Sequence, residues 1–136
     1  MNSFNHYAYG AVAEWMFAYM AGIKPVEEYP GFEKFILAPT PDTREYIPDG
    51  QERITSVKAE YESASGLVKS AWCYENGEFV YRATVPENTE ATVYFPLLSG
   101  KTTVNVNGLE FAENGDFKIQ NGKMIFILTA GEYVIK

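Results

Sequence analysis

Four Asn-Gly pairs restrict the fold of this chain more than any other feature of its sequence. Asparagine and glycine adopt positive φ angles more readily than other residues, so the pair favours the tight turn that joins two antiparallel strands. The pairs begin at residues 76, 107, 114 and 121, and three of them stand directly between short runs of alternating apolar and polar residues. The second half of the chain is therefore predicted to be a series of β-hairpins.

Short runs of this kind fill the chain after Arg53. Phe79, Tyr81, Ala83 and Val85 share one face of their run, as expected for a strand that buries one side. The predicted strands are 54–61, 67–74, 78–85, 90–95, 102–106, 109–111, 117–120, 123–128 and 132–135. We therefore predict a mainly β fold, an antiparallel, jelly-roll-like β-sandwich of eight or nine strands that forms a C-terminal domain over residues 54–136.

The N-terminal stretch NSFNHYAYGAVAEWMFAYMAG, residues 2–22, has a different pattern. Asn2 or Ser3 supplies an N-cap, and Gly22, followed closely by Pro25, supplies a left-handed stop. One long N-terminal α-helix is therefore predicted within residues 1–23. The helix lacks a polar face, which is typical of a helix that neighbours cover on most sides.

Residues 24–53 separate this helix from the sandwich. They contain five prolines, which exclude a long helix, and one short apolar run at 35–37 that is typical of a strand. We interpret the segment as a proline-rich connector.

The charge of the chain excludes two classes of partner. Eighteen acidic and eleven basic residues give a net charge of −7, and the basic residues are scattered. Nucleic acids and anionic membranes bind concentrated Lys and Arg, so neither is a predicted partner.

The apolar stretch from Ala8 to Ile23 is short for a bilayer and contains Glu14, so no membrane span is predicted. No signal peptide is visible and Cys73 is the single cysteine, which favours a cytoplasmic location.

Side chains able to perform chemistry are few. One histidine and one cysteine cannot form a His/Cys zinc site, and no glycine-rich phosphate loop is present, so no metal and no cofactor is predicted. Cys73 is interpreted as a small core residue. Ser3 and His6 lie three residues apart but without a nucleophile elbow, so they predict no catalytic triad. Glu14 has little polar company and is interpreted as structural. His6, near the start of the helix, is the one candidate to line a pocket.

Several segments together resemble a known family. SFNHYAYGAVAEWMFAYMAGI at 3–23 is similar to the last barrel helix of bacterial α-L-rhamnosidases, which are inverting glycoside hydrolases with an (α/α)6 barrel. PGFEKFILAP at 30–39 resembles the link out of that barrel. VKAEYESASGLVKSAW at 57–72 and TVPENTEATVYFP at 84–96 resemble the β-sandwich that follows. The last forty residues match only loosely, ending in AGEYVI at 130–135.

The resemblance implies a role for one residue and an absence of others. The family histidine of the NHY motif contacts bound rhamnose, and the matching residue is His6. The family's general acid and general base lie upstream in the barrel, so no catalytic residue is expected in this chain. Rhamnose-containing glycosides are the implied substrates of the full-length enzyme, and the chain alone is expected to be inactive. Met1 is compatible with an internal methionine, an expression start or the start of a truncated gene.

Two alternatives stay open from the sequence. A freestanding carbohydrate-binding or protein-interaction sandwich would use Trp72, Tyr74 or Tyr81 to stack on sugars, although alternation places Trp72 and Tyr74 on one strand face, as in a core. A structural piece would assemble with itself or with a separately encoded barrel. Because the helix is so apolar, we expect it to fold onto its own sandwich or to pair with the same helix in a homodimer.

Overall fold

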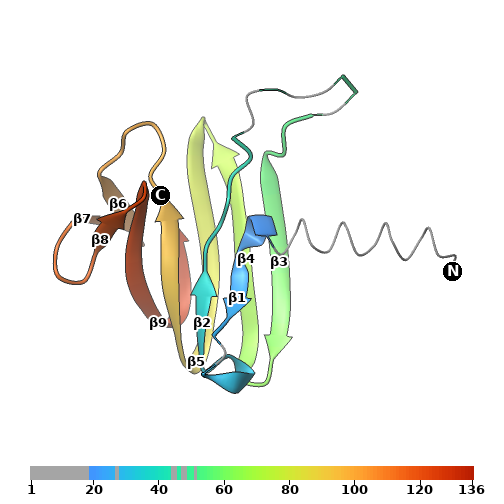
Figure 1. Ribbon diagram of the computed structural model, residues 1–136, viewed down its shortest axis with the longest axis vertical. Helices are drawn as coiled ribbons and strands as arrows, with labels where there is room; N and C mark the ends of the chain where they lie inside the picture. The colour runs from blue at the N-terminus through green and yellow to red at the C-terminus, as the bar shows by residue number, and fades with distance from the viewer. Residues whose placement is uncertain (1–18, 27, 44–45, 47–48, 51) are drawn as a thin grey trace, which may run out of the picture.

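The computed structural model describes residues 19–26, 28–43, 46, 49–50 and 52–136. The fold is mainly β, as predicted (Figure 1). The elements are β1 (Ile23–Pro25), the 3-10 helix η1 (Pro30–Phe32), β2 (Lys34–Leu37), β3 (Ser56–Ser63), β4 (Gly66–Glu75), β5 (Glu78–Pro96), β6 (Thr103–Val106), β7 (Leu109–Ala112), β8 (Lys118–Gln120) and β9 (Lys123–Ile135).

The long strands β5 and β9 build the sandwich, because each pairs in two different places. The first part of β5 pairs with β4 and with the end of β9. Its second part pairs with β2 and with the start of β9, beyond a shift in register between Val85 and Glu90. This gives two layers, β3-β4-β5-β9-β6-β7 and β1-β2-β5-β9-β8. The ring centroids of Phe79 and Phe95, from the two parts of β5, lie 5.7 Å apart, and this contact joins the layers.

Two pairs of predicted strands are each one continuous strand. Runs 78–85 and 90–95 merge in β5, and runs 123–128 and 132–135 merge in β9. In the register, Val85 faces Gly131 and Glu90 faces Thr129, so residues 86–89 form a bulge opposite a single residue of β9. The predicted turn at 86–89 is therefore absorbed as a bulge within a paired strand.

One pairing departs from the predicted antiparallel arrangement. β2 runs parallel to β5, with Phe35 opposite Ala91 and Leu37 opposite Val93. No hairpin joins β2 to β5, because β3 and β4 lie between them in the sequence, so local turn chemistry does not fix the direction of β2. The connector also supplies β1, a strand that the sequence did not indicate.

Three Asn-Gly pairs form the predicted hairpin turns. Both residues of each pair have positive φ at 76–77, 107–108 and 121–122. The fourth pair does not form one, because the side chain of Asn114 competes with it: Asn114 Oδ1 accepts hydrogen bonds from the N–H groups of Asp116 at 2.7 Å and Phe117 at 3.1 Å.

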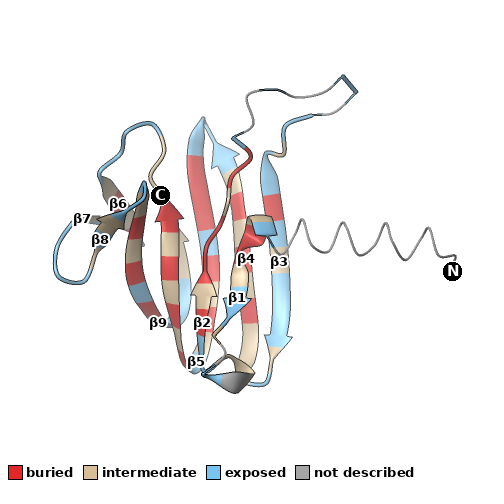
Figure 2. Cartoon of the chain, in the orientation of Figure 1, coloured by how far each residue is buried: buried red, intermediate tan, exposed pale blue. Residues whose placement is uncertain are grey.

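The core lies between the two layers, where Figure 2 shows buried residues alternating along the strands. The predicted face of Phe79, Tyr81, Ala83 and Val85 is buried throughout. The prediction for Cys73 is wrong: this residue is only partly buried, and its sulfur lies 3.9 Å from an Arg82 nitrogen on the outer face. Strand alternation places Cys73 opposite to Trp72, so the two cannot share the core.

The end of the predicted helix lies within the described residues. Residues 19–21 are helical, and Gly22 follows with a φ of +74°, which confirms the predicted stop. The remainder of the predicted long helix, residues 1–18, lies outside the described residues. In the described part of the chain, no helix has the length and hydropathy needed to cross a membrane.

Candidate functional site

The sandwich binds consecutive carbonyl groups where residues 20–22 enter it. Met20 O accepts hydrogen bonds from Trp72 Nε1 and from the N–H of Thr40, both at 2.9 Å. Ala21 O accepts a hydrogen bond from Ser70 Oγ at 2.6 Å. The last carbonyls of a helix have no partner within the helix, so these bonds satisfy groups that would otherwise be unpaired.

The next carbonyl is bound in the same way. Gly22 O accepts a hydrogen bond from the N–H of Ala38 at 2.9 Å. Gly22 is buried, and a Cβ on it would lie 2.0 Å from Ala38 O, so only glycine fits. We call the four donors to these carbonyls the carbonyl anchor: Ala38, Thr40, Ser70 and Trp72.

A second buried hydroxyl supports the anchor. Tyr81 Oη lies 2.7 Å from Ser70 Oγ, and both residues are fully buried. Ser70 has one hydroxyl proton and donates it to Ala21 O, so the Tyr81 hydroxyl donates to Ser70. Burial raises the pKa of Tyr81, and the hydrogen bond with Ser70 lowers it by a smaller amount.

Alkaline pH is expected to destabilise the chain through Tyr81. Because its folded pKa is above the ordinary value of 10.0, the folded chain keeps the phenol proton at a pH where the unfolded chain loses it. The free energy of unfolding therefore falls as pH rises above about 10. Tyr81→Phe should lose about 1 kcal/mol near neutral pH, because Ser70 loses its donor, but should lose less stability on further alkalinisation. Urea unfolding between about pH 7 and 11 measures how the free energy of unfolding depends on pH in the wild-type chain and in Tyr81→Phe. An equal dependence in both would contradict the raised pKa of Tyr81.

Two of the three aromatic residues considered as sugar platforms are buried: Trp72 belongs to the anchor, and Tyr81 supports it. Trp72 is 2% exposed and Tyr81 is 0% exposed, so neither ring is available to a ligand. Tyr74 is 37% exposed and is the one member of this set at the surface.

An apolar groove lies beside the anchor. It has a volume of about 380 Å³ and runs between β1, η1 and β3. The rings of Phe32 and Tyr61 are 4.8 Å apart, and Tyr61 is 47% exposed. We call this surface the β1–β3 groove; its apolar lining is Ala21, Ile23, Pro25, Phe32, Ala59 and Tyr61. Apolar surface exposed beside a helix end is typical of a contact with another structural unit.

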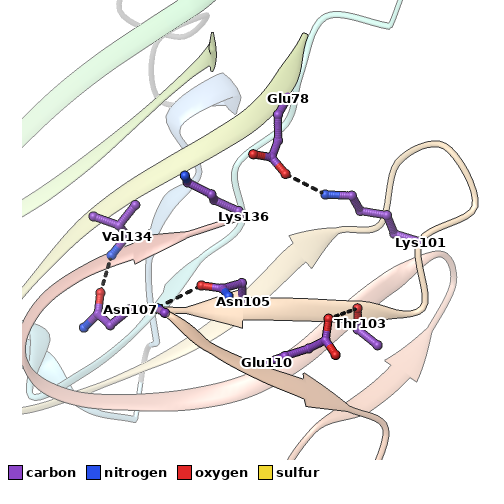
Figure 3. Close-up of a pocket in the computed structure, with 9 residues that line it drawn as sticks. Glu78, Lys101, Thr103, Asn105, Asn107, Glu110, Val134 and Lys136 are labelled. Carbon is purple, nitrogen blue, oxygen red and sulfur yellow. Dashed lines mark hydrogen bonds and ion pairs between the residues drawn. The ribbon is translucent and has the colours of Figure 1, made fainter. Parts of the chain in front are cut away.

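A polar hollow of about 850 Å³ lies at the other edge of the same layer (Figure 3). Its lining is Glu78, Lys101, Thr103, Asn105, Asn107, Gly108, Glu110, Val134 and Lys136. The Lys101 ammonium lies 3.3 Å from a Glu78 oxygen, and this ion pair links the start of β5 to the loop before β6. Asn107 Oδ1 accepts the N–H of Val134 at 2.7 Å, which fixes the turn that closes one end.

The site residues singled out from the sequence precede Tyr19, the first described residue. His6, Glu14 and Ser3 are outside the described residues. Within the described ranges, no group of three His, Cys, Asp or Glu side chains is arranged to hold a metal ion. Asp42 is buried and accepts the N–H of Ile54 at 2.8 Å, so it closes the loop between β2 and β3.

Sequence reasoning missed the anchor. Ser70 and Ala21 are 49 residues apart, and Trp72 and Met20 are 52 residues apart. A serine on the inner face of an otherwise apolar strand was the available signal, because a buried hydroxyl requires a partner.

A family model described as the bacterial alpha-L-rhamnosidase C-terminal domain matches residues 22–110. A curated alpha-L-rhamnosidase of Streptomyces avermitilis is 43% identical over 96 residues, which cover 71% of this chain and 8% of that protein. Another, from Formosa agariphila, is 31% identical over 119 residues, which cover 88% of this chain and 12% of that protein. The chain therefore spans about a tenth of the length of these relatives.

Two solved structures have the same fold. The alpha-L-rhamnosidase from Dictyoglumus thermophilum matches with a TM-score of 0.73 at 25% identity, covering 93% of this chain and 13% of that one. The Streptomyces avermitilis enzyme, complexed with L-rhamnose, matches with a TM-score of 0.69 at 32% identity, covering 99% of this chain and 12% of that one.

Proposed function

The chain belongs to the family of bacterial α-L-rhamnosidase C-terminal domains, and on this premise we propose that it forms the end of an enzyme that releases terminal α-L-rhamnose from glycosides. In this proposal, the predicted helix within residues 1–23, which the structure ends at Ala21, is the last helix of an (α/α)6 barrel. Residues 24–53 are the connector, and residues 54–136 are the sandwich. Strands β1 and β2 of the connector complete the second layer of the sandwich.

The carbonyl anchor is the observation that supports a bracing role. It holds three consecutive carbonyls at the end of the predicted helix by hydrogen bonds from two side chains of β4 and from two backbone N–H groups after β2. His6 precedes Met20 by fourteen residues. At 1.5 Å per residue, a helix of that length extends about 21 Å from the anchor. The sandwich would therefore fix one end of the rod that carries the proposed rhamnose contact, His6.

The β1–β3 groove supports the same role. It exposes Phe32 and Tyr61 beside the point where residues 20–22 enter the sandwich. Helices of a barrel that precedes this point would cover these rings. In the isolated chain the same apolar surface favours pairing of two copies through the N-terminal helix.

The chain alone is proposed to be inactive, because inversion needs a general acid and a general base on opposite sides of the sugar. Each contributes about 10²- to 10⁴-fold to the rate. One histidine cannot supply both the general acid and the general base. Purified chain is expected to release no p-nitrophenol from p-nitrophenyl α-L-rhamnoside above the buffer blank.

A chimera tests the positive part of the proposal. This chain replaces the matching C-terminal part of the Streptomyces avermitilis enzyme, and the chimera is expected to hydrolyse the same substrate. His6→Ala in the chimera should lower kcat/KM at least about tenfold, which corresponds to loss of about 1.4 kcal/mol of transition-state stabilisation. A folded chimera whose kcat/KM is unchanged by His6→Ala would exclude the rhamnose contact, and turnover by the chain alone would exclude inactivity.

A further inference from the structure

A second hollow adjoins the polar hollow and contains the exposed aromatic ring. It has a volume of about 530 Å³, and Tyr74, Asn76 and Phe95 are part of its lining. Glu78, Lys101 and Lys136 line both hollows. The Glu78–Lys101 ion pair is therefore a shared wall, and the two hollows form one composite groove. Both volumes lie within the range of small-molecule sites.

The ring of Tyr74 is held in place by its neighbours. Its centroid lies 6.2 Å from that of Trp72 and 5.6 Å from that of Phe79, at interplanar angles of 84° and 66°. These edge-to-face contacts fix the ring while leaving 37% of the residue exposed. A rigid aromatic surface of this kind binds the C–H face of a ligand at little entropic cost.

The side-chain charges of the composite groove cancel. The Glu78 and Glu110 carboxylates balance the Lys101 and Lys136 ammonium groups, so the lining side chains offer no net charge to an ionic ligand. Neutral hydrogen-bonding groups are also in place. Asn105 Oδ1 accepts the N–H of Gly108 at 2.9 Å, which orients the amide. Within the described residues, Asn105 Nδ2 has no acceptor and remains available to a ligand.

The composite groove begins near the carbonyl anchor, because the Tyr74 ring contacts Trp72, and its polar hollow extends away from the anchor. The polar hollow is built on β6 and β7, at the edge of the layer opposite to β3. The β1–β3 groove and residues 20–22 lie at the β3 and β4 side (Figure 1). A barrel that docks beside residues 20–22 would leave the polar hollow open to solvent.

We infer that the composite groove is an accessory site for a neutral saccharide, with Tyr74 packing on a sugar ring and Asn105 bonding its hydroxyls. Saccharide hydroxyls both donate and accept hydrogen bonds, which suits adjacent amide, carboxylate and ammonium groups. This inference does not use the proposed rhamnose contact at His6. It retains one of the three aromatic residues that the sequence suggested for sugar binding.

An NMR titration of the whole chain tests the inference. The probes are methyl α-L-rhamnoside, cellohexaose and a neutral rhamnose-rich oligosaccharide, with hexagalacturonate as an anionic comparator. At least one neutral probe is expected to shift the amide signals of Asn76, Glu78, Lys101 and Asn105 saturably, with a Kd on the order of 1 mM. Tyr74→Ala should weaken this binding at least about tenfold, and Tyr74→Phe should keep it.

Two further variants make the test specific. Asn105→Ala removes the amide without touching the core and should also weaken binding, which covers the case in which Tyr74→Ala fails to fold. Tyr29→Ala is the matched control, because Tyr29 is 38% exposed but lies outside the composite groove, and it should bind normally. Absence of saturable shifts with every neutral probe, shifts located elsewhere, or binding of hexagalacturonate alone would overturn the inference. None of these outcomes depends on the activity of the chimera.

Discussion

Gly22→Ala is expected to lower the free energy of unfolding by about 4 kcal/mol, near the upper end of the range for point substitutions. Two effects combine at this position. Gly22 has a φ of +74°, which costs an L-residue about 1–2 kcal/mol. The new Cβ would also lie 2.0 Å from Ala38 O, a backbone atom that cannot move without breaking the hydrogen bond from Ala38 to Gly22 O.

Gly122→Ala separates these two effects. Gly122 also has a φ of +74°, but a Cβ added to it would have nothing within 4 Å. This variant should therefore lose only the conformational part, about 1–2 kcal/mol. Urea unfolding of both variants measures the difference, which we expect to be about 2 kcal/mol or more. Equal losses would mean that residues 20–22 do not lie against Ala38.

The sequence was sufficient to predict most hairpins, because their determinants are local. At Asn76-Gly77, for example, two residues with positive φ join strands whose alternation already fixes the buried face. The burial of Tyr81 and Val85 follows from the same alternation. The prediction for Cys73 was wrong because it rested on the apolar neighbours of this residue. Cys73 directly follows Trp72 in β4, so strand alternation puts its side chain on the opposite face.

Features that depend on distant partners could not be predicted. β2 pairs in parallel with β5, from which β3 and β4 separate it in the sequence, so no short-range pattern sets that direction. The carbonyl anchor likewise joins β4 to residues about fifty positions earlier, through backbone carbonyls that carry no sequence signal. The resemblance identified the segments that belong to one family. The hydrogen bonds that join these segments could be found only in the structure.

The anchor also explains why an unusually apolar helix can end on a sandwich. A helix terminus buried without partners would leave several carbonyls unsatisfied, each at a cost of about 1–3 kcal/mol. Here an indole, a hydroxyl and two backbone N–H groups accommodate the carbonyls of Met20, Ala21 and Gly22. The cost of removing one of these donors should therefore exceed the loss of its packing alone.

Trp72→Ala is expected to destabilise the chain by about 3–5 kcal/mol, because it empties a site in which Trp72 is 2% exposed. Trp72→Phe is the more informative change. It keeps most of the ring packing and removes the Nε1 donor to Met20 O, so it should cost about 2 kcal/mol and loosen residues 20–22 selectively. Hydrogen exchange at the amide of Thr40, which also bonds Met20 O, reports that loosening.

Phe79→Leu provides the matched control for Trp72→Phe. The Phe79 ring packs against Trp72 with centroids 5.5 Å apart, is 6% exposed and makes no hydrogen bond to residues 20–22. Both variants therefore disturb the same aromatic cluster, but only Trp72→Phe removes a carbonyl partner. Exchange at Thr40, measured relative to the core amide of Phe126, should rise in Trp72→Phe and stay near the wild-type ratio in Phe79→Leu. The same ratio in both variants would make Trp72 a packing residue and leave the anchor to Ser70 and the two backbone donors.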